Sequence, residues 1–131
     1  ASNLFIPDVN PVWRECFRVL KPGGRLLSGF LNPAVFLFDH DEALASGELV
    51  VRYRLPYAEP DSLNPTAREQ WLASGRAAEF GHTLQQQIGG QLAAGFVLID
   101  LYEDGWSDDA TVLNRYSTVA VATRARKWNH R

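Results

Sequence analysis

The chain has a single cysteine, no methionine, no long apolar run and no excess of either charge. With Cys16 alone, it can form no internal disulfide and no cysteine-rich zinc site. Its 13 basic and 15 acidic side chains give a net charge of −2, which argues against nucleic-acid and anionic-membrane partners. No apolar run approaches the roughly 20 residues of a membrane span, and no secretory leader is visible. We therefore expect a cytoplasmic protein with no bound metal.

The missing methionine has two explanations. Either an initiator was removed from in front of Ala1, or the chain is a piece of something longer. The 131 residues suit one domain, 1–131. A chain of this size buries roughly two-thirds of its unfolded surface, which is enough for one core.

The first expected element is a helix that begins at Pro11, with Asp8 or Asn10 as its cap. Its apolar positions recur at spacings of three and four, which is typical of one buried face. These positions are Val12, Trp13, Cys16, Phe17 and Leu20. The run 21–24 (KPGG) ends the helix. The following strand, 25–31, is apolar on both faces, which predicts a central strand covered by helices on both sides.

Residues 34–63 are expected to leave the main sheet as a lid-like excursion. Within it, 49–55 alternates apolar and polar positions, which predicts a strand. Arg52 and Arg54 share one face of that strand, either as a solvent-facing edge or as an attraction for an acidic acceptor. Pro65 begins a short helix that runs to about residue 73.

A second strong helix begins after Thr83, with Gln86 three residues later in the capping-box position. Gly89 and Gly90 lie inside it, each at a cost of roughly 1 kcal/mol relative to alanine, and indicate close packing on a neighbour. Strands are then predicted at 96–102 and 116–123. Because no helix separates these two strands, we expect them to be antiparallel.

The residues after the last predicted strand, 124–131, are expected to form a frayed tail. The loop between the two strands carries five acidic residues from Asp100 to Asp109. We interpret it as solvated, because the oxygen spacing of a calcium loop is absent.

Three segments together resemble one family. WRECFRVLKPGGRLLSGF, EFGHTLQQQIGGQLAAGFVLIDLYED and YSTVAVATRARK are similar to the closing part of class I S-adenosylmethionine-dependent methyltransferases, of the type 11-like kind. The likeness covers about residues 5–127. It implies an α/β, partial Rossmann-like fold: a small mixed sheet with an antiparallel C-terminal hairpin and flanking helices. In that fold the last strand lies between 25–31 and 96–102.

The cofactor-binding half of the family pattern is absent from this sequence. The family holds S-adenosylmethionine with a glycine-rich loop after its first strand and an acidic residue after its second. Here the glycine pairs 23–24 and 89–90 lie at a helix end and inside a helix, and neither joins a strand to a helix. The chain therefore resembles a C-terminal part, and we expect no cofactor to bind to it alone.

Three residues are candidates for the site. Ligands in open α/β sheets collect beyond the carboxyl ends of the strands. Asn32 follows the strand 25–31, and Asn3 would follow a missing fourth strand of the family fold. We assign Asn3 to the cofactor and Asn32 to the substrate, with turn formation as the alternative for both. His82 precedes a helix cap and is assigned to substrate, either as a general base or as a local hydrogen bond that shapes the loop.

The resemblance implies part of an enzyme that moves a methyl group from S-adenosylmethionine to a small-molecule acceptor by direct displacement. A second hypothesis is a non-enzymatic truncated domain that acts as a homodimer or partner-binding module. A third is an enzyme of two chains. The dimer follows from the strand 25–31, which would lack its fourth-strand neighbour and leave backbone groups unpaired at an edge.

Overall fold

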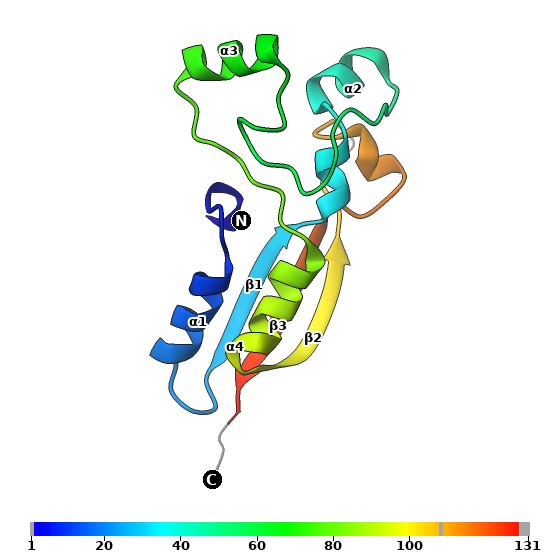
Figure 1. Cartoon of the computed structure of the whole chain (residues 1–131). Coiled ribbons are helices and arrows are strands. Elements are labelled where there is room, and N and C mark those ends of the chain that lie inside the picture. The colour runs from blue at the N-terminus through cyan, green and yellow to red at the C-terminus, as the bar shows by residue number, and fades with distance from the viewer. Residues whose placement is uncertain (1, 108, 129–131) are drawn as a thin grey trace.

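The computed structural model describes residues 2–107 and 109–128. Three strands form one sheet, and four α-helices and several single turns accompany it (Figure 1). The strands are β1 (Arg25–Leu31), β2 (Phe96–Asp104) and β3 (Ala120–Lys127). The helices are α1 (Asn10–Val19), α2 (His40–Ser46), α3 (Pro65–Ser74) and α4 (Gly90–Ala94). The described residues contain no helix that is both long enough and apolar enough to cross a bilayer.

The sheet has the order β1-β3-β2, and both pairings are antiparallel. Ser28 of β1 pairs with Thr123 of β3, and Leu101 of β2 pairs with the same threonine from the other side. A register shift interrupts β2 between Leu98 and Asp100. The predicted position of the last strand, between the other two, is thus confirmed.

The limits of the last strand differ from those predicted. Residues 116–119 precede β3, because Val112–Arg115 form a 3₁₀ turn that delays its start to Ala120. The expected tail is wrong for residues 124–127, which belong to β3. Burial and hydrogen bonds hold residues 124–127 in place. Ala125 is fully buried, and the Lys127 ammonium donates to the Phe17 and Leu20 carbonyls at 2.7 and 2.9 Å. The rest of the expected tail, beyond Trp128, lies outside the described residues.

Only one face of the sheet is covered. Phe17 of α1 meets Phe96 of β2 edge-on at 5.2 Å between ring centroids, and Gln91 of α4 bonds to Thr123 of β3 on that same face. On the opposite face Leu27 is 73% exposed. The expectation that β1 is buried on both sides is therefore wrong for the described chain. Its apolar sequence is that of a buried strand, but no second layer lies over it among these residues.

The two helices meet at a glycine. An added Cβ at Gly90 would lie 2.6 Å from Trp13 Cδ1, so the close packing predicted for this position is confirmed. The reciprocal capping box is confirmed as well: Gln86 N donates to Thr83 Oγ1 at 3.1 Å, and Thr83 N donates to Gln86 Oε1 at 3.0 Å. The first turns of the helix that follows, Gln85–Gly89, are a π-helix.

The segment after β1 leaves the sheet as expected, without the predicted strand at 49–55. Pro33–Leu37 form a 3₁₀ turn, and a single bridge joins Phe38 to Val51. No ladder develops, because Arg52 N and Tyr53 N both donate to the same Leu37 carbonyl. A small core fixes the excursion to the end of the sheet. It consists of Val35, Leu113 and Val119, with Phe36, Phe38 and Leu49 packed against it.

Candidate functional site: a cavity at the carboxyl end of the first strand

The structure brings two of the three predicted site residues together. Both His82 and Asn3 are buried. His82 Nε2 donates to the Asn3 carbonyl at 2.8 Å, and the Asn3 amide donates to Gln87 Oε1 at 3.1 Å. His82 therefore ties the N-terminal turn to the segment that begins α4. It also lines a small pocket together with Phe30 and Gln87.

Asn32 lies elsewhere and makes turn-forming bonds. Its side chain accepts from Ala34 N at 3.0 Å and donates to the Thr118 carbonyl at 3.5 Å. The side chain caps the 3₁₀ turn that follows β1. Within the described residues its side chain makes no hydrogen bond to His82 or Asn3.

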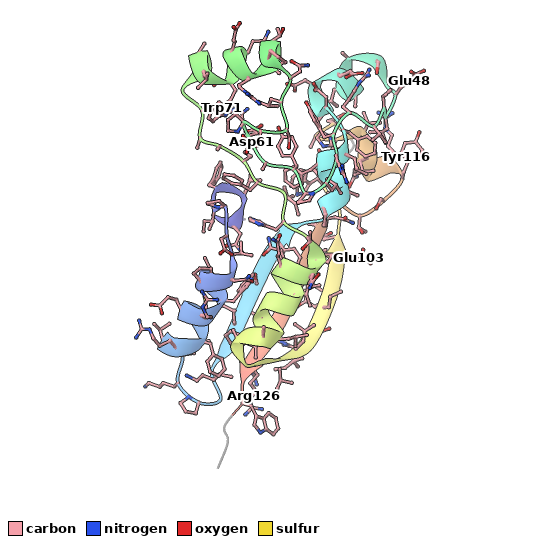
Figure 2. The ribbon with its side chains drawn as sticks, in the orientation of Figure 1. Glu48, Asp61, Trp71, Glu103, Tyr116 and Arg126 are labelled. Atoms are coloured by element: carbon pink, nitrogen blue, oxygen red, sulfur yellow. The ribbon has the colours of Figure 1, made fainter. Side chains whose placement is uncertain are left out.

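A cavity of about 660 Å³ opens beyond the end of β1, under α3 and beside α2. Leu4, Leu31 and Phe36 line both this cavity and the small pocket of His82, so the two spaces adjoin. Figures 1 and 2 show α3 above this region, with Trp71 directed from the helix toward the loops below it. The volume falls within the range of ordinary small-molecule sites. The position agrees with the rule that ligands of α/β sheets lie beyond strand carboxyl ends.

A buried carboxylate organises one wall of the cavity. Glu59 accepts the Tyr57 hydroxyl at 2.6 Å, two Arg76 nitrogens at 2.9 and 3.2 Å, and the Glu79 backbone N–H at 3.1 Å. Burial and the hydrogen bond to Glu59 hold the pKa of Tyr57 far above its ordinary value. The same carboxylate raises the pKa of Arg76 by hydrogen bonding. Arg76 therefore fastens the chain after α3 to the loop before it.

Aromatic rings form much of the remaining wall. Phe36 stacks on Tyr57 with centroids 5.5 Å apart, and Tyr53 meets Tyr57 edge-on at 5.0 Å. Trp71 and Trp106 line the cavity from other elements. The Trp71 indole N–H is buried and has no hydrogen-bond partner among the described residues.

The cavity carries more acid than base. Asp39, Asp41, Glu59 and Glu79 line it, and Arg76 is the one Lys or Arg among the described residues of the lining. Arg76 is bound by both nitrogens to Glu59, and it lies 3.7 Å from Glu79. Burial raises the pKa of Glu79, and repulsion by Glu59 adds to the rise. The lining is therefore net negative when its carboxyl groups are ionised.

His40 also lines the cavity, but both of its ring nitrogens are engaged. Nε2 lies 2.6 Å from the Val35 carbonyl, which can only accept, so Nε2 carries a proton. Nδ1 lies 3.2 Å from Thr111 Oγ1, and that hydroxyl already accepts from Leu113 N. His40 fastens α2 to the turn after β2 and is not placed as a base.

Other predicted features have structural partners. Arg52 pairs with Glu42 of α2 through contacts of 3.0 and 3.1 Å, which accounts for one of the two arginines at 52 and 54. Across the described ranges 2–107 and 109–128, no group of three potential ligands could hold a metal ion. This search includes every acidic residue of the stretch 100–109 except residue 108, which lies outside the described residues; Asp100, Glu103 and Asp104 belong to β2 and not to the predicted loop.

The described residues do not form the glycine-rich strand–loop–helix pattern that holds S-adenosylmethionine in class I methyltransferases. Gly23 and Gly24 form the turn between α1 and β1, and Gly23 takes a positive φ of 82° there. Gly90 lies against Trp13, where no ligand has room. Neither pair is an open loop between a strand and the helix that follows it. S-adenosylmethionine would need binding elements other than these.

Sequence reasoning did not identify the residues that shape the cavity. Tyr57, Glu59, Arg76 and Trp71 come from two loops and one helix, and their meeting depends on tertiary structure. One signal was available in the aromatic and acidic run 53–59, which was interpreted only as a strand and a loop.

The chain is similar in sequence to a known protein. No family model matches the chain. It is 44% identical over 127 residues to YbaJ of Bacillus subtilis (strain 168), which is named an uncharacterized methyltransferase; the match covers 97% of this chain and 48% of YbaJ. The chain thus spans about half the length of that relative.

Two solved structures have the same fold in part. One is an S-adenosylmethionine-dependent methyltransferase of Mesorhizobium loti, with a TM-score of 0.63 at 15% identity, covering 95% of this chain and 57% of that one. The other is a proposed enzyme of that class from Listeria monocytogenes, with a TM-score of 0.59 at 14% identity, covering 97% and 58%. By sequence the chain is similar to about half of a protein named as a methyltransferase, and by fold it is similar to part of S-adenosylmethionine-dependent methyltransferases.

Proposed function

We propose that this chain supplies the acceptor-binding part of an S-adenosylmethionine-dependent methyltransferase that works in the cytoplasm. One observation carries the proposal: an aromatic-walled cavity of about 660 Å³ lies at the carboxyl end of β1, in a methyltransferase fold. Much of the rate of methyl transfer comes from alignment of donor and acceptor, so a shaped cavity is itself a large part of the catalytic apparatus.

We further propose that the 131 residues by themselves do not catalyse. The chain corresponds to 48% of YbaJ, and its glycine pairs 23–24 and 89–90 lie in a turn and in a helix. Binding of the cofactor would then depend on residues outside this sequence.

His82 is proposed to contact the acceptor, because its pocket adjoins the large cavity through Leu31 and Phe36. Asn3 is proposed to contact the cofactor side, where its buried carbonyl is held by His82. For Asn32 the substrate role stays a prediction, and its two turn-forming bonds support the structural alternative.

A chimaera of YbaJ, with its matching segment replaced by this chain, tests the proposal. Titration calorimetry with S-adenosylmethionine should show one site in the chimaera and in YbaJ, and no heat of binding for the 131-residue chain alone. Stoichiometric micromolar binding by the chain alone would refute the proposal that the 131 residues need further residues to bind the cofactor. Binding by YbaJ but not by a folded chimaera would refute the shared function.

A second candidate is a homodimer, and the open edge of β1 favours it. Within the described residues β1 pairs only with β3, and Leu27 is exposed on the uncovered face. A two-fold axis along that edge would join two sheets into one and pair the open backbone groups. Light scattering should then give twice 14.7 kDa at micromolar concentration, and a mass of 14.7 kDa would exclude this candidate.

A further inference from the structure

We infer that the cavity under α3 binds an organic cation: an amine or quaternary ammonium group attached to an apolar body. That such an amine is the methyl acceptor rests on the proposed function. That the cavity binds it rests only on the lining residues, so the two claims can fail separately.

Charge gives the first argument. Four carboxylates and one guanidinium line the cavity, and Arg76 is already bound to Glu59 by two hydrogen bonds. Asp39 and Asp41 have no salt bridge to any described residue. A cleft lined mainly by one charge concentrates the field and attracts the opposite charge. Among the described residues of the lining, no unpaired Lys or Arg would receive an anionic ligand.

The aromatic wall gives the second argument, because it provides what a cation with apolar substituents requires. Tyr53, Tyr57 and Phe36 form a contiguous cluster through ring contacts of 5.0 and 5.5 Å. Ring faces attract cations, and such rings recognise quaternary ammonium groups in other proteins. The apolar body of the ligand would lie against Leu63, Ala67 and Trp71 from α3 and the loop before it.

Glu79 is the group placed to receive the charge. It lines the cavity, its side chain is one-third exposed, and its nearest cation is Arg76 at 3.7 Å, beyond hydrogen-bond distance. Arg76 is committed more closely to Glu59 at 2.9 Å. A ligand cation beside Glu79 would provide the close partner that no described residue offers there.

The test compares three probes of one shape and different charge: 4-phenylbutylamine, 4-phenylbutanol and 4-phenylbutyrate. Calorimetry at pH 7.5 on the 131-residue chain, without S-adenosylmethionine, measures each Kd. The amine should bind at least tenfold more tightly than the alcohol, and the carboxylate more weakly than either. Equal binding of amine and alcohol, tighter binding of the carboxylate, or no binding of the amine below 10 mM would overturn the inference.

Variants then test which side chains bind the ammonium group of the probe. Glu79→Gln should weaken amine binding three- to tenfold and leave alcohol binding unchanged, whereas Glu48→Gln, on the exposed loop after α2, should change neither (Figure 2). Tyr53→Leu should weaken the amine more than the alcohol. Equal weakening of both probes would mean a general loss of shape and would contradict a cation site. Thermal unfolding of each variant confirms that it is folded.

Discussion

The indole of Trp13 in α1 lies directly against Gly90 of α4. A Cβ at position 90 would be 2.6 Å from Trp13 Cδ1, while Trp13 Nε1 donates to the Gln86 carbonyl at 3.0 Å. This contact joins the two helices that cover the sheet. It also holds the segment 82–86, through which His82 reaches Asn3.

Replacement of that glycine should destabilise the fold. Gly90→Ala gains up to about 1 kcal/mol in helix propensity, but it forces the Trp13 ring to shift, at a cost of about 1–3 kcal/mol in a packed core. We expect a net loss in the free energy of unfolding, measured by urea denaturation. Gly89→Ala is the matched control. Its Cβ would meet only Gln85 Cγ at an ordinary 3.6 Å, so it should stabilise the chain. Equal effects at the two positions would contradict this packing.

The ionised Glu79 carboxylate should lower the stability of the folded chain at neutral pH. Burial raises its folded pKa above the ordinary 4.5. For a raised acid, stability is fully present below the unfolded pKa and is lost as pH rises through the folded pKa. Glu79→Gln should therefore raise the free energy of unfolding by at most about 1 kcal/mol at pH 7, since the group is partly solvated.

The difference between Glu79→Gln and the parent chain should shrink toward zero as pH falls below about 4.5, where the parent glutamate is protonated. Urea denaturation at pH 4 and pH 7 measures it. A gain that is equal at both pH values would show that charge is not its cause.

Loss of Arg76 should open the cavity wall. Arg76→Met leaves Glu59 buried without its two guanidinium hydrogen bonds, which should cost about 1–3 kcal/mol. The exposed side of the pair is solvated, which keeps the cost in the lower half of that range. Arg68→Met, on the exposed face of α3, is the control and should stay within about 0.5 kcal/mol of the parent chain. If thermal denaturation gives the two variants equal stability, the ion pair does not hold this wall.

Local sequence patterns correctly predicted several helices and strands and how the strands pair. Apolar residues at spacings of three and four predicted α1. Thr83 and Gln86 predicted the capping box that they form, and the absence of a crossover helix between β2 and β3 predicted that these strands are antiparallel. Each of these rests on residues close in sequence or on a chain-length argument.

The excursion and the cavity were not predictable in the same way. The alternation at 49–55 is real, but a strand also needs a partner, and Leu37 offers a single carbonyl to two N–H groups. Glu59 and Arg76 are 17 residues apart and meet only because α3 folds back between them. Residues that meet only in the folded chain produce no periodic pattern in the sequence.

Blocking the cavity tests directly whether it holds the methyl acceptor. The blocking variant is Ala67→Trp in the YbaJ chimaera, a change in the α3 wall of the cavity. Transfer of labelled methyl groups from S-adenosylmethionine to the small molecules of a bacterial extract is the measurement. If the cavity holds the acceptor, transfer should fall at least tenfold, while the Kd for S-adenosylmethionine stays within twofold of the unblocked chimaera. Transfer that continues undiminished through the blocked chimaera would contradict an acceptor site in this cavity.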